Sequence, residues 1–163
     1  MIGRYLAAFG PASVMDIQTW SGLTRLRGVV DGMRPRLRVF RDERGRELFD
    51  LPDVPLADPD LPVPVRFLPA FDNLLLGHTE RSRVISDEDR KRVMPGGAIV
   101  RPTFLVDGFV RGTWSLEGTT LLLSPFRQPS EEDAAAVLEE AERLLDFVAP
   151  DAEANEVRFV GGC

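Results

Sequence analysis

Apolar residues recur at helical spacing in three short segments at the start of the chain. Residues 2–9 combine this spacing with a following Gly-Pro pair, which ends helices. Ser13 stands three residues before Asp16 in a capping-box arrangement, which predicts a second helix ending near Gly22. A third helix is predicted over residues 24–33, with an apolar stripe on one side and polar residues on the other.

Alternating polar and apolar positions follow these helices. Residues 36–41 and 46–51 each alternate, and the Gly-containing turn at 42–45 joins them into a β-hairpin. Three helices followed by a two-stranded ribbon form the winged-helix arrangement, in which the third helix can enter a major groove and the ribbon can touch phosphates. Many winged helices serve protein–protein contacts alone, so the pattern predicts the fold more firmly than it predicts DNA binding.

Prolines divide the chain into two modules. Residues 52–65 contain five Pro and three Asp, a composition that favours extended chain and excludes a helix. We therefore expect a winged-helix module over residues 1–51, a Pro-rich acidic linker over 52–65, and a second module over 66–163.

Strand periodicity dominates the second module. Strands over 99–106 and 109–116 join through an Asp-Gly pair typical of a type I′ hairpin, and a strand over 119–123 follows a Glu-Gly pair. Pro102 predicts that its strand lies at a sheet edge or contains a bulge. The whole pattern is typical of an antiparallel β-meander.

A long amphipathic helix follows the meander. Ser130 and the three acids after it predict where the helix begins, and Pro150 predicts its end. Its apolar stripe should pack across the sheet, and residues 157–160 should return to that sheet as a last strand. The predicted fold class is therefore α+β: a winged helix, with three helices and a β-hairpin wing, followed by an antiparallel β-meander domain with a long C-terminal helix.

Residues 67–92, between the linker and the meander, hold the single histidine of the chain. Asp72 is suited to begin a short helix, the three leucines at 74–76 are suited to burial, and Gly77 permits a left-handed stop. We expect the run after Gly77 to lie at the surface.

His78 stands close to Arg81 and Arg83 in that run. Three roles are open for it: a phosphate contact, a general acid, or an ordinary half-buried side chain. The sequence offers no second His, no nearby Cys and no Ser-His-Asp pattern, so the structural role is favoured.

Charge is distributed unevenly along a chain whose net charge is −6. Residues 1–46 contain nine Arg and four acids (+5), 47–65 five acids (−5), 66–92 six bases and five acids (+1), and 93–163 five bases and twelve acids (−7). A local basic face matters more than the global sum for attracting phosphates, so the first module is the candidate DNA-binding part. The alternative is that its arginines are merely solvated.

The remaining composition limits other kinds of site. The one cysteine, Cys163, can form neither an internal disulfide nor a metal cluster, and we expect it to be inert. No apolar run approaches the roughly 20 residues that span a bilayer, and the N-terminus lacks the apolar core of a signal peptide. The sequence therefore predicts a cytoplasmic protein with no membrane association, no metal and no cofactor.

Several stretches stand out together: RYLAAFGPAS followed by WSGLTRLR, then RELFDLPD, FLPAFDNLLLGHTERSRV and LVDGFVRGTW. They resemble the C-terminal part of the winged-helix DNA-binding-domain proteins that include the bacterial interstrand-crosslink-repair DNA glycosylases of the AlkZ/YcaQ type. The resemblance extends from about Arg4 to Val160, and FDNLLLGHTERSR is its most specific string.

The resemblance implies tandem winged helices that form a concave DNA-binding face in longer proteins. The family's glycosylases use a Gln-x-Gln or Gln-x-Asp pair in a first winged helix to handle the attacking water, and this chain matches only their later part. Asp16-Ile17-Gln18 imitates such a pair in the opposite order, and Asp16 is better explained as a helix-start residue. We expect no catalytic residue here, and enzymatic activity stays undecided, since base excision also requires a pocket that reads an extruded nucleotide.

These observations converge on backbone contacts with double-stranded DNA, which orient a protein without reading sequence and give weak, salt-sensitive binding. A separate N-terminal winged-helix module, or self-association, is a further candidate partner. Two other interpretations stay open: a protein-interaction module that uses the acidic helix 130–149 and the meander, and an intact glycosylase with an unconventional active site. The predicted DNA-contacting residues are Thr24, Arg25, Arg27, Arg36, Arg38, Arg41, Arg44, His78, Arg81 and Arg83.

Overall fold

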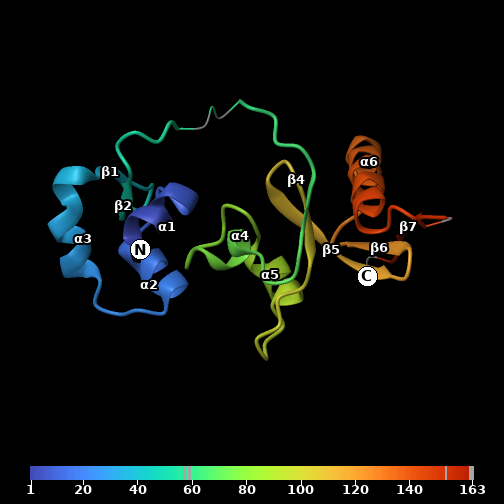
Figure 1. Ribbon diagram of the computed structural model, residues 1–163, viewed down its shortest axis with the longest axis horizontal. Coiled ribbons are helices and arrows are strands. Elements are labelled where there is room, and N and C mark those ends of the chain that lie inside the picture. The colour runs from blue at the N-terminus through green and yellow to red at the C-terminus, as the bar shows by residue number, and fades with distance from the viewer. Residues whose placement is uncertain (57, 59, 153, 162–163) are drawn as a thin grey trace. The chain divides into compact units, whose positions relative to one another are not determined.

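The computed structural model describes residues 1–161 apart from 57, 59 and 153, and the chain divides into two compact units (Figure 1). Unit 1 comprises Met1–Leu61 and Asn73–Arg81, and unit 2 comprises Pro62–Asp72 and Ser82–Cys163. The sequence pattern placed residues 73–81 in the second module, whereas the structure groups them with the first. Cys163 lies outside the described residues.

Unit 1 contains the predicted order of three helices and a β-hairpin, which is confirmed. A short 3₁₀ turn joins the third helix to the hairpin, and a further short helix comes from the second segment of the unit. The elements are α1 (Ile2–Phe9), α2 (Val14–Ser21), α3 (Arg27–Met33), η1 (Arg34–Arg36), β1 (Arg38–Arg41), β2 (Glu47–Asp50) and α4 (Asn73–Leu76).

Local sequence explains where the first two helices begin and end. Ser13 and Asp16 form the predicted capping box, in which each side chain accepts a hydrogen bond from the other residue's backbone N–H. Gly22 then ends α2 in the left-handed region, at φ 69°. Gly10, after α1, is extended and not left-handed. A Cβ there would lie 2.2 Å from Oδ1 of Asp50, so close packing, and not a left-handed stop, requires the glycine.

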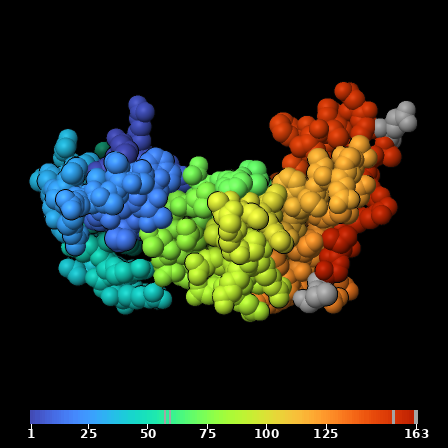
Figure 2. Space-filling model, turned by 90° about the horizontal axis from the view of Figure 1, so that it is seen from below, coloured from blue at the N-terminus to red at the C-terminus, as the bar shows by residue number. Residues whose placement is uncertain are grey.

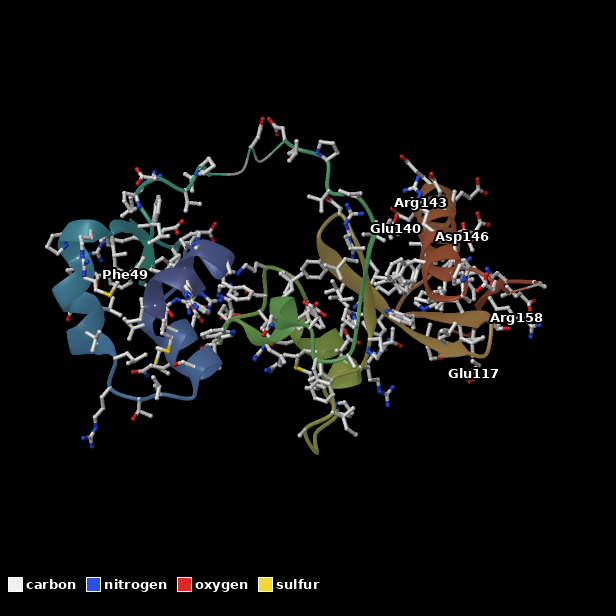
Figure 3. All side chains as sticks on the ribbon, viewed as in Figure 1. Phe49, Glu117, Glu140, Arg143, Asp146 and Arg158 are labelled. Atoms are coloured by element: carbon white, nitrogen blue, oxygen red, sulfur yellow. The ribbon has the colours of Figure 1, made fainter. Side chains whose placement is uncertain are left out.

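The core of unit 1 forms where the three helices meet the hairpin. Phe49 of β2 is fully buried and lies inside the unit (Figure 3). It exchanges two backbone hydrogen bonds with Ala12, of 2.8 and 3.0 Å, which fix the hairpin against the α1–α2 connection. The buried apolar residues are Ile2, Tyr5, Leu6, Ala12, Ile17, Leu26, Val30 and Phe49.

Residues 73–81 complete unit 1 through contacts with α1. The Tyr5 hydroxyl donates a 2.5 Å hydrogen bond to the carbonyl of Gly77. Gly77 does not adopt the predicted left-handed conformation. A Cβ there would lie 3.3 Å from the Phe9 ring and 2.8 Å from the Asn73 carbonyl, so close approach again requires the glycine. Of the three leucines predicted to be buried, only Leu75 is fully buried.

Unit 2 is built on a five-stranded sheet. The predicted meander is present, but the sheet is mixed and not purely antiparallel, because the last strand runs parallel to its neighbour. A crossover helix between these two strands permits the parallel pairing. The strands follow the spatial order β3 (Arg66–Leu68), β4 (Thr103–Val106), β5 (Phe109–Glu117), β6 (Thr120–Pro125) and β7 (Glu156–Phe159), with the helices α5 (Asp87–Val93) and α6 (Glu131–Val148).

Pro102 has a different position from the predicted one. Strand β4 begins at Thr103, after the proline, and lies between β3 and β5, so it is not an edge strand. The Pro102 carbonyl still accepts a 3.2 Å hydrogen bond from the backbone N–H of Trp114. The register of β4 against β5 shifts between Phe104 and Leu105, which agrees with the predicted bulge.

Helix α6 packs on the sheet of unit 2 as its apolar stripe predicts. Ser130 caps its N-terminus, accepting a 3.0 Å hydrogen bond from the backbone N–H of Asp133. Arg143 and Asp146 are exposed, whereas Glu140 lies on a flank of the helix, 3.4 Å from Arg66 of β3 (Figure 3). The surface of α6 and β7, in red, adjoins the orange surface of β6 (Figure 2). The core residues are Val65, Phe104, Leu121, Leu123, Val137, Ala141 and Leu145.

Candidate nucleic-acid interface

Three arginines of unit 1 converge on one glutamate, Glu47, at the start of β2. Arg27 begins α3, Arg34 lies in η1, and Arg41 ends β1. Their guanidinium nitrogens lie 3.5, 2.6 and 3.9 Å from the Glu47 carboxylate. Arg34 is the main cause that lowers the pKa of Glu47 below its ordinary value. One carboxylate, together with Asp31 beside Arg34, faces three cations, so a positive excess remains on this part of the surface.

The other arginines of the hairpin differ in how they are compensated. Arg44, in the turn, lies 3.1 Å from Glu80, and Arg46 lies 2.6 Å from Asp42. Four further arginines of the first 46 residues have no carboxylate within 4.0 Å among the described residues. These are Arg4, Arg25, Arg36 and Arg38.

Arg38 points away from the Glu47 cluster. Side chains alternate across a strand, so Arg38 and Arg41, three positions apart in β1, lie on opposite sides of the hairpin. The Arg38 guanidinium lies 4.9 Å from the centroid of the Phe40 ring. The hairpin therefore presents cations on both of its sides.

The third helix begins later than predicted. It starts at Arg27, so Thr24 and Arg25 lie in the preceding loop and not on a helix. Arg25 has φ 61°, which no helical residue adopts. The side-chain carbonyl of Gln18 accepts a 2.9 Å hydrogen bond from the backbone N–H of Leu26. That contact holds the loop across the start of α3.

His78 is buried, at 7% exposed, which corrects at this position the expectation that the run after Gly77 lies at the surface, whereas Thr79, Ser82 and Arg83 of the same run are exposed as expected. Its Nδ1 lies 3.8 Å from the Asp16 carboxylate. The rings of Tyr5 and Phe9 lie 6.3 and 6.4 Å from its own, centroid to centroid. A side chain this buried offers no surface to a phosphate, so we exclude His78 from the predicted DNA contacts.

Asp16 joins α2 to the segment 73–81. Its Oδ2 accepts hydrogen bonds of 2.8 and 2.7 Å from the backbone N–H and hydroxyl of Ser13, and its Oδ1 accepts one of 2.8 Å from the backbone N–H of Thr79. Burial alone raises the pKa of Asp16, but the interactions with His78, Ser13 and Thr79 outweigh burial and hold the pKa well below its ordinary value. The carboxylate is thus ionised and fully engaged in structure.

The Asp16-Ile17-Gln18 string therefore has a structural explanation. Both polar side chains are hydrogen-bonded within unit 1, Asp16 to residues of two segments and Gln18 to the start of α3. This occupancy supports the interpretation of Asp16 as a helix-start residue. Among the described residues, no group of three or more His, Cys, Asp or Glu side chains is arranged to hold a metal ion.

Arg81 and Arg83 belong to different units. Arg81 closes the second segment of unit 1, donating hydrogen bonds to the carbonyls of Leu75 and Thr79. Arg83 is exposed and belongs to unit 2. Within unit 1 the predicted contacts do not form one cluster, because Arg38 and Arg41 lie on opposite sides of the hairpin and His78 is buried.

A groove of about 730 Å³ lies within unit 1 next to the arginine cluster. The start of α2, the first residue of α3, the hairpin turn and Thr79 line it. Arg27 and Glu47 connect it to the cluster described above. The groove is open, and its lining combines charged and apolar side chains.

Two residues of the cluster, Arg34 and Glu47, were not predicted as site residues. A usable signal existed for Glu47, because the hairpin register places it directly opposite Arg41. Opposite charges at such cross-strand positions attract each other. No local pattern indicated that Arg34 would reach the same carboxylate, since it depends on how η1 joins the hairpin.

A model of the family described as DNA glycosylase AlkZ-like matches residues 1–147. The chain belongs to the AlkZ-like family. The interstrand DNA cross-link repair glycosylase of Streptomyces sahachiroi is 30% identical over an alignment of 155 residues, covering 86% of this chain and 40% of that protein. The solved structure of the S. sahachiroi DNA glycosylase AlkZ matches with a TM-score of 0.77 and 27% identity.

That structural match covers 98% of this AlkZ-like chain but 44% of the solved chain. This chain therefore spans less than half the length of the relatives it matches. The match agrees with the resemblance noted in the sequence and with the α+β fold. No helix in the described part of the chain has the length and apolar character needed to cross a membrane.

Proposed function

We propose that this AlkZ-like chain binds duplex DNA through unit 1. The main support is that Arg27, Arg34 and Arg41 converge on the single carboxylate of Glu47, which leaves cationic groups at the surface. The planar guanidinium group of arginine can donate two parallel hydrogen bonds to phosphate oxygens. Such contacts position a protein on the duplex without specifying sequence. The names of the relatives, which are DNA glycosylases, make DNA the expected polyanion.

Salt dependence tests this proposal directly. Labelled duplex should bind at low salt, and its affinity should fall steeply between about 50 and 200 mM salt, because releasing counterions into a more concentrated salt solution yields less free energy. Anisotropy titrations at several salt concentrations measure this slope. Absence of binding at micromolar protein and low salt contradicts the proposal.

Two variants distinguish the sides of the hairpin. Arg41→Ala removes a cation from the Glu47 cluster, and Arg38→Ala removes one from the opposite side. Each variant that removes a phosphate contact should weaken binding on all sequences and lower the salt slope by about one. Arg158→Ala is the matched control, because Arg158 is also exposed, at 61%, but lies in unit 2 beside Glu156.

We propose further that bond cleavage in this family depends on parts of the relatives outside the aligned region. The hydrogen bonds that occupy Asp16 and Gln18 support this assignment. Incubation of the purified chain with alkylated duplex is the test. Binding without base release agrees with the proposal, and release of a damaged base by the chain alone overturns it.

A second candidate function is a protein contact through α6. Phe147, near the end of this helix, is 83% exposed and lies one helical turn after the exposed Arg143. Val148, the next residue, is 43% exposed, and an aromatic side chain within an exposed apolar patch is a common centre for a protein interface. Sedimentation of the wild type and of Phe147→Ser tests self-association through α6. If both proteins are monomers, self-association through this helix is excluded.

A further inference from the structure

Two adjoining cavities of about 420 and 250 Å³ lie within unit 2. They occur where β6 ends, where α6 begins and where β7 ends. Small-molecule sites commonly occupy about 300–1,000 Å³. The larger cavity falls in that range, and the smaller one extends it toward the core. The two share the lining residues Pro125, Arg127, Gln128, Pro129, Ser130 and Phe159.

The inner cavity has an apolar floor. Phe104 and Val137, both from the core of the unit, line it. Gly112 of β5 allows this arrangement, because a Cβ there would lie 2.4 Å from the Phe104 ring. The Phe104 ring therefore lies directly against the strand backbone. Phe159 of β7, which lines both cavities, is 40% exposed and offers an accessible aromatic surface.

The rim supplies hydrogen-bond donors and acceptors. The Arg127 guanidinium is held 2.8 Å from the carboxylate of Asp89, a side chain that is 1% exposed. Arg111 lies over the Phe109 ring at 5.4 Å and also lines the inner cavity. Asp133 adds an acceptor, so planar groups with both donors and acceptors can be paired at the rim.

The charges of this rim are balanced. The lining contains two arginines, Arg111 and Arg127, and two acids, Glu131 and Asp133. Asp89 additionally offsets Arg127. The side-chain charges thus give a phosphate little net attraction, whereas a neutral flat ring gains stacking and paired hydrogen bonds.

We propose that this pocket binds a nucleobase, presented as a nucleoside or as an unpaired base of a DNA strand. Phe159 stacks against the ring, Phe104 and Val137 close the apolar floor, and Arg111, Asp133 and Gln128 contact the polar edge of the base. The site lies wholly within unit 2. It shares no residue with the arginine cluster of unit 1 that is proposed to hold the duplex.

Isothermal titration calorimetry and ligand-detected NMR test the pocket. In both experiments the full chain is titrated with adenosine, guanosine, cytidine or thymidine. At least one nucleoside should bind with a submillimolar dissociation constant. Phe159→Ala should weaken binding by about fivefold or more, since stacking of a base on an aromatic ring contributes at least that factor. Leu116→Ala is the matched control, because Leu116 is likewise 40% exposed and does not line either cavity.

The phosphorylated form of each nucleoside provides a second arm. Equal affinity for adenosine and its monophosphate is expected from the balanced rim. Binding of inorganic phosphate alone, or at least tenfold tighter binding of the monophosphate, would identify an anion site and overturn the proposal. Failure of every nucleoside to bind at millimolar concentration overturns it as well.

Failure here is distinguishable from failure of duplex binding. Arg41→Ala should alter duplex affinity and leave nucleoside affinity unchanged, because Arg41 belongs to unit 1. Phe159→Ala should weaken nucleoside binding and leave the affinity for fully paired duplex unchanged. If Arg41→Ala abolishes nucleoside binding, the assignment of the pocket to unit 2 is wrong.

Discussion

The Glu47 cluster of unit 1 and two arginines of unit 2, Arg127 and Arg143, are compensated in opposite ways. In unit 1 three guanidiniums share the carboxylate of Glu47. Two arginines of unit 2 have the reverse ratio: Arg143 of α6 contacts two carboxylates, those of Glu139 and Glu140, and Arg127 likewise contacts two acids. The Glu47 cluster is therefore available to a polyanion, whereas Arg127 and Arg143 are neutralised by their acids. The number of carboxylates around each arginine predicts its availability to a polyanion better than the number of arginines does.

The units also differ in how distant segments are joined. In unit 1, single polar contacts bridge long separations: Tyr5 to Gly77 across 72 positions and Asp16 to Thr79 across 63. In unit 2, β4, β5 and β6 pair as consecutive neighbours along the chain. Local pairing tolerates the loss of one contact better. Unit 1 should therefore be the more sensitive unit to polar substitutions.

The largest expected effects come from the two cores. Phe49→Ala removes a fully buried ring from unit 1 and should cost about 3–5 kcal/mol, and Leu121→Ala should cost about 2–5 kcal/mol in unit 2. Hydrogen exchange resolved by peptide measures protection separately in each unit. We expect Phe49→Ala to reduce protection in residues 1–61 and 73–81 and to leave the β5–β6 hairpin protected.

The reverse pattern is expected for Leu121→Ala, which makes each variant the control for the other. Equal loss of protection throughout the chain in both variants would show that the two units unfold together. In that case the division into two compact units describes contacts and not independent stability.

The next effect in size concerns the carboxylate that joins α2 to residues 73–81. Asp16→Asn should lower the free energy of unfolding by about 2 kcal/mol at pH 7, because Ser13 and Thr79 lose a charged acceptor. The pKa of Asp16 is lowered in the folded state. Its stabilisation is therefore present above the unfolded pKa of about 3.9 and is lost as the pH falls toward the folded pKa.

The difference between the wild type and Asp16→Asn should consequently be greatest near neutral pH and shrink below about pH 4. Urea denaturation at several pH values measures it. Asp146→Asn, an exposed position on α6 (Figure 3), is the control and should leave stability unchanged. A pH-independent loss in Asp16→Asn would show that the carboxylate acts through shape and not through charge.

Local patterns predicted the parts of the fold that depend on neighbouring residues. The capping box of Ser13 and Asp16 and the hairpin around residues 42–45 follow from adjacent side chains and turn chemistry. Helix α5 was missed although Ser86 and Asp89 give a similar signal, since Asp89 donates its backbone N–H to the Ser86 hydroxyl. Its seven residues include few apolar positions, so periodicity alone did not indicate it.

Long-range contacts account for most of what the sequence did not predict. The later start of α3 depends on Gln18 reaching Leu26, and the burial of His78 depends on residues 73–81 packing against α1 and α2. Neither contact produces a periodic pattern of residues in the sequence. The basic character of the first module was predictable from composition, but which arginines share a carboxylate depends on tertiary structure.

The smallest and most specific change tests the charge ratio itself. Glu47→Gln removes the carboxylate shared by Arg27, Arg34 and Arg41 while preserving the size of the side chain. Duplex affinity should rise roughly two- to fivefold at low salt, and the gain should diminish as salt screens the charges. Glu140→Gln in unit 2 is the matched control, because Glu140 also pairs with arginines, Arg66 and Arg143. The same net charge change there should leave duplex affinity unaltered if unit 1 holds the DNA. Equal gains in both variants would mean that overall charge, and not the cluster around Glu47, determines binding.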